Sequence, residues 1–275
     1  MTVGVGVLAS ESVKPDALIM IADTMGSFED DYSTSELHKL HAIESEDLYA
    51  VSADRVDRAA EQVDMLKNVF RKDFPKPRNY GHILRALMQT ASLYKSLRFE
   101  VDVLPQFRMS VDDWFKVQDP HMRDSILKEY RDFYVGCQTI IGTFNESGQA
   151  FLFCLPGDGT VQNHCFPGFT AIGTGANNAL FWLSHRKQRL SLSTKRSAYH
   201  AFEAKLMAES SPHVNERLDM IVARKDKSFL FHRDKEEVEG APLSVPEPRK
   251  LFKKFNVKDT GPLDPSDQST KPTYQ

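Results

Sequence analysis

The sequence predicts an α+β protein of four layers, in which two antiparallel sheets stack face to face and helices cover both outer surfaces (αββα). Two observations predict this class. Apolar or alternating segments of strand length occur in pairs joined by short polar turns, as in antiparallel hairpins. Two pairs of helical segments separate these groups of strands. No internal repeat or solenoid period is present.

The N-terminal part predicts two hairpins. Residues 2–8 alternate small or β-branched side chains with glycines, and residues 17–22 are continuously apolar, so we expect two strands buried on both faces. A second hairpin is expected over residues 39–43 and 48–52, after an irregular excursion over residues 23–36.

Two amphipathic helices are expected next, over residues 56–70 and 79–97. Pro75 and Pro77 end the first, because proline cannot continue a helix. The apolar face of the second helix is expected to contain Ile83, Leu84, Leu87, Ala91 and Leu93.

An insertion and the second half of the sandwich follow. Residues 98–133 mix apolar and charged side chains, and we predict an inserted, partly helical segment there. We predict one domain over residues 1–232 and a polar tail over 233–275 that is disordered or packs on a neighbouring subunit. Within the domain, strands are expected at 134–144, 149–155, 160–161, 169–172, 218–223 and 228–232, and helices at 177–187 and 194–209.

Composition excludes several classes of function. The net charge of −3 gives no electrostatic reason to expect a nucleic acid or an anionic membrane as partner. The apolar runs fall far short of the roughly 20 residues that cross a bilayer, and no secretory signal is recognisable, so we expect a cytoplasmic chain that begins as the mature protein. Cys137, Cys154 and Cys165 form no C-x-x-C pair and are expected to be reduced and buried. The spacings do not favour a metal site.

The N-terminus suggests a nucleophile. Methionine aminopeptidases remove Met1 when the next side chain is small, which would expose Thr2 as the first residue. An α-amine with a pKa near 7.7 to 8.0 is partly neutral at pH 7 and can accept the proton of the threonine hydroxyl. The alternative is that Thr2 is an ordinary strand residue behind a retained methionine.

Asp23 and Lys39 are candidates for tuning that amine. A nearby cation would keep the amine neutral, and an anion would orient the cation. Asp23 follows the second predicted strand and Lys39 begins the third, so both could lie beside the start of the first strand. The plainer interpretations are a turn residue for Asp23 and a lysine at a sheet edge for Lys39.

The motifs around these residues resemble a known family. The runs Thr2-Val-Gly-Val-Gly-Val, Ala17-Leu-Ile-Met-Ile-Ala-Asp-Thr and Lys39-Leu-His-Ala-Ile resemble the opening of proteasome β-type subunits and their bacterial HslV-type relatives. The segment Phe169-Thr-Ala-Ile-Gly-Thr-Gly-Ala-Asn-Asn-Ala-Leu is similar to the family's A-I-G-S-G-x-x-x-A-L segment. The resemblance covers roughly residues 2–74 and 134–232 and suggests a divergent bacterial member.

The resemblance implies the fold of N-terminal-nucleophile (Ntn) hydrolases and a role for each matching position. Thr2 would be the nucleophile, its α-amine the base, and Asp23 and Lys39 the charge-tuning pair. Thr174 stands where the family has the serine of G-S-G, whose hydroxyl supports the amine. Asp54 stands where a glycine N–H helps to form the oxyanion hole. The positions that shape the specificity pocket correspond to His41, Ser52 and Val56.

Three departures from the family pattern stand out. The turn over residues 10–16 is longer than usual, which a hairpin tolerates. Asp54 introduces a carboxylate beside the oxyanion position, which is unfavourable unless it points away. The family's second catalytic aspartate corresponds to a position near Ser211, with Glu209 the closest acid.

The leading hypothesis is therefore a threonine-type peptidase. The resemblance implies peptide or unfolded-protein substrates, a self-compartmentalising homo-oligomer (a ring or a stacked assembly), an AAA+ ATPase as a candidate partner, and no cofactor. Two alternatives stay open: a catalytically silent ring subunit of the same fold, and an amidase that acts on small molecules. A nucleotide site at Gly173-Thr174-Gly175 is disfavoured, because no Walker lysine follows and no βαβ unit surrounds it.

Overall fold

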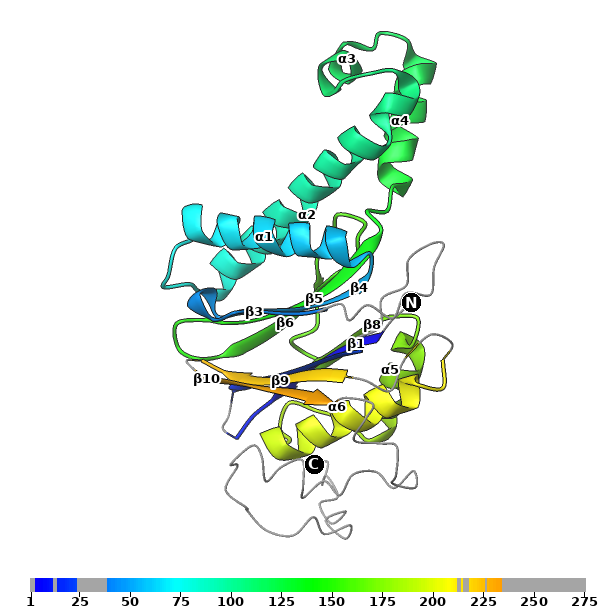
Figure 1. The fold of residues 1–275 in the computed structure, drawn as a ribbon. Helices are drawn as coiled ribbons and strands as arrows, with labels where there is room; N and C mark the ends of the chain where they lie inside the picture. Colours follow the sequence, from blue (N-terminus) through cyan, green and yellow to red (C-terminus); the bar gives the residue numbers. More distant parts are fainter. Residues whose placement is uncertain are drawn as a thin grey trace, which may run out of the picture. The chain divides into compact units, whose positions relative to one another are not determined.

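The computed structural model of the chain describes residues 3–11, 14–23, 39–211, 214, 218–225 and 227–233 (Figure 1). All of these residues belong to one compact unit over residues 1–240. The predicted tail lies outside the described residues except for Arg233, which is the last residue of a strand.

The first sheet is antiparallel throughout and has the strand order β10-β9-β2-β1-β8. Its register brings several chain segments to one end of the sheet, because Val3 lies opposite Gly173 and Asp23 lies opposite Leu218. Its strands are β1 (Val3–Ala9), β2 (Ala17–Asp23), β8 (Phe169–Gly173), β9 (Leu218–Arg224) and β10 (Lys227–Arg233).

The second sheet is also antiparallel and has the order β3-β4-β5-β6-β7. The strand predicted at residues 160–161 was misplaced, because the edge strand is formed by the exposed pair Gln162 and Asn163. Its strands are β3 (Leu40–Ile43), β4 (Leu48–Asp54), β5 (Cys137–Phe144), β6 (Ala150–Leu155) and β7 (Gln162–Asn163), with a 3-10 turn η1 (Glu44–Glu46) between β3 and β4.

Glycines let the two sheets approach closely, which explains the Val-Gly alternation of β1. A Cβ on Gly4 would lie 2.5 Å from Cγ1 of Val51 in the opposite sheet, and one on Gly6 would lie 2.9 Å from Cγ2 of Ile140. The valines of β1 therefore face the other way, toward the covering helices. The core between the sheets contains Leu8, Leu18, Met20, Tyr49, Val51, Ile140, Phe144, Leu152, Ile172 and Ile221, among others.

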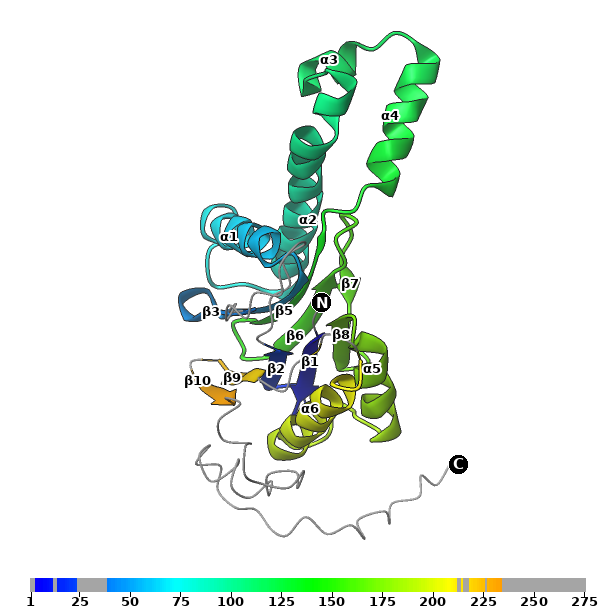
Figure 2. The same ribbon diagram turned by 45° about the vertical axis from the view of Figure 1, so that its right-hand side comes forward.

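Helices cover the outer face of each sheet (Figures 1 and 2). Helices α1 (Val56–Lys72) and α2 (Tyr80–Asp102) pack on the second sheet, and α5 (Ala176–His185) and α6 (Thr194–Ala208) pack on the first. The predicted α+β class with two antiparallel sheets is confirmed, and the layers are consistent with a sandwich. Leu93 was wrongly expected on the buried face of α2, because its side chain is 50% exposed.

The predicted insertion, residues 98–133, forms a helical arm. Helix α2 leads away from the sheets into the arm, and α4 runs back beside it (Figure 2). The arm has its own aromatic cluster, in which the ring of Phe99 contacts those of Trp114, Tyr130 and Phe133. Besides the end of α2, the arm contains η2 (Leu104–Phe107), α3 (Val111–Lys116) and α4 (Pro120–Asp132).

Candidate active site

A buried ion pair joins the two sheets at the end of β2. Asp23 is the last residue of β2 and Lys39 directly precedes β3, and their side chains are 0% and 1% exposed. Lys39 Nζ donates a hydrogen bond to Asp23 Oδ1 at 2.9 Å. The backbone amide of Val3 donates to the same oxygen at 3.1 Å. The structure thus brings the two expected charge-tuning residues together at the start of β1.

Burial sets the electrostatics of this pair. Removing an ammonium from water disfavours its charged form, and this desolvation lowers the pKa of Lys39. The Asp23 carboxylate opposes the shift through its charge and its hydrogen bond, and the charge of Asp54 opposes it further. Lys39 therefore releases its proton more readily than an exposed lysine. While it is protonated, its positive charge favours the neutral form of any adjacent amine.

Thr2 itself lies outside the described residues. The next residue in the chain, Val3, is described, and its amide nitrogen contacts the Asp23 carboxylate.

Thr174 lies at the same end of the first sheet. The neighbouring Gly173 is opposite Val3 in the β1–β8 pairing and has a φ of +84°, a conformation that glycine adopts without strain. Gly175 is packed against β1 so closely that a Cβ there would lie 3.2 Å from Val3 Cβ. The strand-to-helix turn therefore presents the exposed Thr174 beside the start of β1.

Asp54 ends β4 in a left-handed conformation, with a φ of +66°. Its carboxylate Oδ2 accepts a hydrogen bond from the Tyr134 hydroxyl at 2.5 Å. Tyr134 was missed as a site residue and wrongly expected to begin a strand, whereas β5 starts at Cys137. No local signal could have found this contact, because 80 residues separate the two side chains.

The three residues expected to shape a specificity pocket lie on β3, on β4 and at the start of α1. Ser52 is fully buried, and both its amide and its hydroxyl donate to the carbonyl oxygen of Lys39, at 2.9 and 3.3 Å. Ser52 therefore fixes the backbone of Lys39 and exposes no surface of its own. His41 is half-buried on β3, and the half-buried Val56 begins α1.

The region of the expected second aspartate has local partners. The Glu209 carboxylate accepts from Lys205 Nζ at 2.5 Å, one helical turn earlier. The hydroxyl of Ser211 accepts from Asn178 Nδ2 at 3.0 Å, which ties the segment after α6 to the first turn of α5. The structure therefore couples Glu209 to Lys205 and does not show it at the Asp23–Lys39 pair.

No family model matches the chain, and a search of curated proteins found no match either. The geometry of the site itself therefore carries the functional argument.

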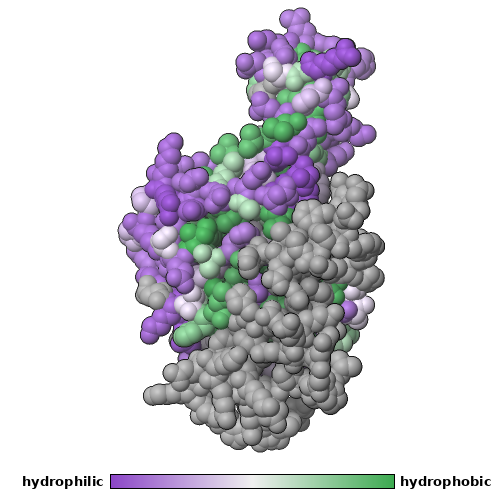
Figure 3. Space-filling model, in the orientation of Figure 1, coloured by the Kyte–Doolittle hydropathy of each residue, from purple (hydrophilic) through white to green (hydrophobic). Residues whose placement is uncertain are grey.

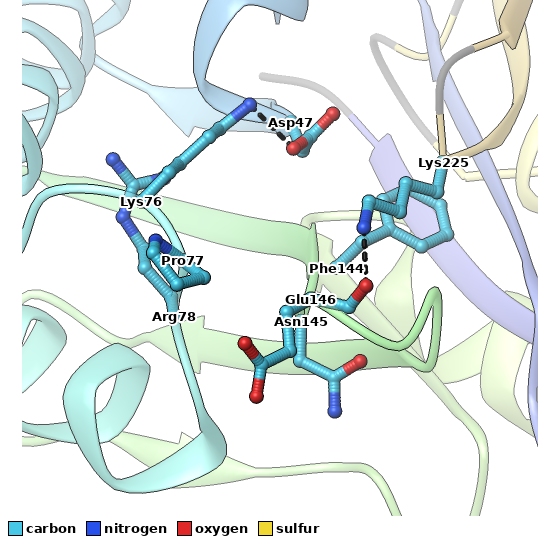
Figure 4. Close-up of a pocket in the computed structure, with 8 residues that line it drawn as sticks. All are labelled: Asp47, Lys76, Pro77, Arg78, Phe144, Asn145, Glu146 and Lys225. Atoms are coloured by element: carbon cyan, nitrogen blue, oxygen red, sulfur yellow. Dashed lines mark hydrogen bonds and ion pairs between the residues drawn. The ribbon is translucent and has the colours of Figure 1, made fainter.

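Two hollows lie elsewhere on the described part of the chain. A pocket of about 270 Å³ is found at the opposite strand ends, since it includes Phe144 at the end of β5 and Lys225 after β9 (Figure 4). There Lys76 pairs with Asp47 at 2.5 Å, and Lys225 donates to the carbonyl of Glu146. A surface groove of about 690 Å³ runs between the packed helices α1 and α2, where apolar side chains of α2 reach the surface (Figure 3).

The described ranges of the chain contain no group of three or more His, Cys, Asp or Glu side chains placed to hold a metal ion. None of their helices combines the length and apolarity needed to span a membrane. The thiols of Cys137 and Cys154 are buried as expected, and desolvation raises the pKa of each to about 12, whereas Cys165 was wrongly expected to be buried and is half-buried.

Proposed function

We propose that the chain is an Ntn hydrolase of the threonine-peptidase type, with the αββα sandwich of that class and with Thr2 as nucleophile once Met1 is removed. The observation that carries this proposal is the buried Lys39–Asp23 pair, whose carboxylate also accepts the amide of Val3. The desolvation penalty of burying two charged groups is roughly several kcal/mol per ion, unless the groups are paired and hydrogen-bonded. A lysine placed there for stability alone is disfavoured, because an apolar side chain would avoid that cost.

The first chemical step forms an ester. The neutral α-amine of Thr2 accepts the hydroxyl proton as Oγ1 attacks the substrate's carbonyl carbon. The resulting oxyanion accepts a hydrogen bond from the backbone N–H of Asp54. The α-ammonium then gives its proton to the leaving amine, the C–N bond breaks, and an acyl ester remains on Thr2. Lys39 keeps the α-amine neutral before attack and stabilises the negative charge that develops.

The second step releases the product. Water attacks the ester carbonyl while the α-amine accepts its proton, so a second tetrahedral oxyanion forms in the same place. The C–O bond to Thr2 breaks, and the α-ammonium returns the proton to the threonine oxygen. Protons and electrons balance without a cofactor.

The proposed substrates are peptides or unfolded proteins, and the proposed assembly is a self-compartmentalising ring of identical subunits in the cytoplasm, served by an AAA+ ATPase. The composition supports these proposals only indirectly: a net charge of −3 gives no reason to expect a polyanion such as a nucleic acid as partner. Light scattering after size-exclusion chromatography measures the assembly directly. A monomer would favour an amidase for small molecules over a compartmentalised peptidase.

The decisive experiment combines intact mass with a covalent probe. We expect the purified chain to lack Met1 and to react once with a peptide epoxyketone, which captures both the amine and the hydroxyl of an N-terminal threonine. Thr2→Ser keeps a hydroxyl and should still be labelled, whereas Thr2→Ala should not. A retained Met1, or labelling that persists in Thr2→Ala, would contradict the proposal.

A specific observation favours a second candidate, the catalytically silent ring subunit. The carboxylate of Asp54 stands beside the N–H that would bind the oxyanion, and a negative charge there opposes catalysis unless it is turned away. A ring-sized assembly whose processed Thr2 does not react with the probe would support this candidate.

A further inference from the structure

The turn after β4 is held twice by the segment that leads out of the arm. The Tyr134 hydroxyl donates to the Asp54 carboxylate at 2.5 Å. The next amide, that of Arg55, donates to the carbonyl oxygen of Gly136 at 3.0 Å. Both the side chain of Asp54 and the backbone beside it therefore depend on residues 134–136.

The backbone of this turn directs the amide of Asp54 toward the site. Successive amides along a strand point to opposite sides. The amide of Ser52 donates to the carbonyl of Lys39 on the β3 side, and the amide of Arg55 donates on the β5 side. The N–H of Asp54 is therefore on the side of Lys39, where the proposed oxyanion would form.

The carboxylate of Asp54 is near enough to the site to matter electrostatically, because its charge raises the pKa of Lys39 against the larger effect of burial. Turned toward the oxyanion, it would repel the negative charge of the transition state. The hydrogen bond from Tyr134 prevents this rotation. Burial and Asp54 itself raise the pKa of Tyr134, so the hydroxyl remains a proton donor at neutral pH.

We propose that Tyr134 is a positioning residue of the proposed active site: it holds the Asp54 carboxylate toward the arm and so leaves the Asp54 amide available to the oxyanion. This inference rests on the proposed function. It also resolves the main obstacle to that function, because a carboxylate engaged by a neutral donor is directed away from the reacting atoms.

The base of the arm fixes the position of Tyr134. Its ring lies against Gly157, where a Cβ would be 2.4 Å from Tyr134 Cε2, and the amide of Val135 donates to the Gly157 carbonyl at 2.9 Å. Arg58 Nη1 donates to the Val135 carbonyl at 2.8 Å, while its Nη2 pairs with Asp102 at the end of α2 at 3.1 Å. Displacement of the arm would therefore release the Asp54 carboxylate and slow the reaction.

The test compares two tyrosines of which only one contacts Asp54. Tyr134→Phe removes the hydroxyl and keeps the ring against Gly157. Tyr130→Phe is the matched control, because its hydroxyl bonds to Ser96 within α2. For hydrolysis of a peptide reporter, we expect Tyr134→Phe to lower kcat about tenfold with KM within about twofold, since it weakens transition-state binding rather than substrate binding. Tyr130→Phe should change neither constant.

A second background separates positioning from structural damage. Asp54→Gly removes the carboxylate and suits the φ of +66°. In that background, adding Tyr134→Phe should leave kcat unchanged, because no carboxylate remains to be held. An equal loss in both backgrounds, or no loss in either, would overturn the inference. If the wild-type chain is neither labelled at Thr2 nor active, the proposed function fails. If the wild type is active and the kcat of Tyr134→Phe equals that of the wild type, only this inference fails.

Discussion

Two buried lysines of this chain have similar partners but different structural origins. Lys39 is 1% exposed and pairs with Asp23 across the two sheets, whereas Lys205 is 0% exposed and pairs with Glu209, the C-cap residue of α6, one turn away. The second pair follows from helical geometry, in which residues four apart are neighbours. The first pair exists only when β2 and β3 have been brought together by the whole fold.

This difference separates a structural role from a functional one. A pair between residues four apart forms as soon as the helix does, although the burial of Lys205 comes from the packing of α6 on the first sheet. A pair between two sheets is a poor way to gain stability, because desolvation offsets most of the attraction. It does place a cation beside the start of β1, where the Val3 amide reaches the same carboxylate. The comparison is therefore consistent with the chemical role proposed for Lys39 and with a structural role for Lys205.

The largest expected effect is on reactivity. Lys39→Met should slow epoxyketone labelling of Thr2 by about 10³-fold, because the α-amine loses the cation that keeps it neutral and the oxyanion loses a stabilising charge. Lys205→Met should label within about threefold of the wild-type rate. Near-UV circular dichroism establishes that both variants are folded. Equal losses in the two variants would remove the distinction between the pairs.

The next effect is on stability. Asp23→Asn leaves the buried ammonium of Lys39 without its carboxylate and should lower the free energy of unfolding by about 3–5 kcal/mol. Glu209→Gln also leaves a buried ammonium, that of Lys205, without its carboxylate, but it should cost less, about 1–3 kcal/mol, because Glu209 is 19% exposed and water can reach the pair. Urea denaturation at pH 7 measures both. The assignment would be wrong if the helical variant proved the more damaging one.

The smallest effect is a pH dependence that belongs to α6 and not to the Asp23–Lys39 pair. Burial lowers the pKa of His200 to about 4 from 6.5, with help from Arg196, and its Nδ1 lies 2.9 Å from Gln188 Oε1. The unfolded chain therefore binds this proton first as the pH falls. Stability is complete above pH 6.5 and declines toward pH 4, by at most roughly 2–3 kcal/mol.

Urea midpoints at pH 7, 6 and 5 test this expectation. His200→Gln should flatten the decline while leaving an amide that can still reach Gln188. A decline of the same steepness in the variant would assign the acid sensitivity to other groups.

Local patterns predicted most of the secondary structure, because strand alternation and helical periodicity survive in the packed molecule. The predicted ends of strands β1 and β2 and of helix α1 lie within two residues of the observed ends. The misplaced strand at residues 160–161 shows the limit: Gln162 and Asn163 are an exposed edge pair with no apolar pattern to mark them. Helix α2 was cut short for a similar reason, since its continuation to Asp102 depends on packing within the arm.

Some residues of the candidate site could likewise be predicted from local patterns, whereas others are identified only by the tertiary structure. Asp23 and Lys39 could be proposed because each lies at the end of a recognisable strand, a weak signal that the resemblance to proteasome β-type subunits strengthened. The contact between Tyr134 and Asp54 could not, because it depends on how the arm returns to the second sheet and on the positive φ of Asp54. Tertiary contacts across an insertion leave no periodic signal.

The glycines of β1 have a consequence for how a substrate approaches. With Gly4 against Val51 and Gly6 against Ile140, the interior leaves no room for an extended polypeptide to slide between the layers. If the proposed peptidase function holds, a substrate chain would instead have to bind at the rim formed by the strand ends. Selectivity would then be decided by what lines that rim, which includes the exposed Thr174 on one side and the Asp54 turn on the other.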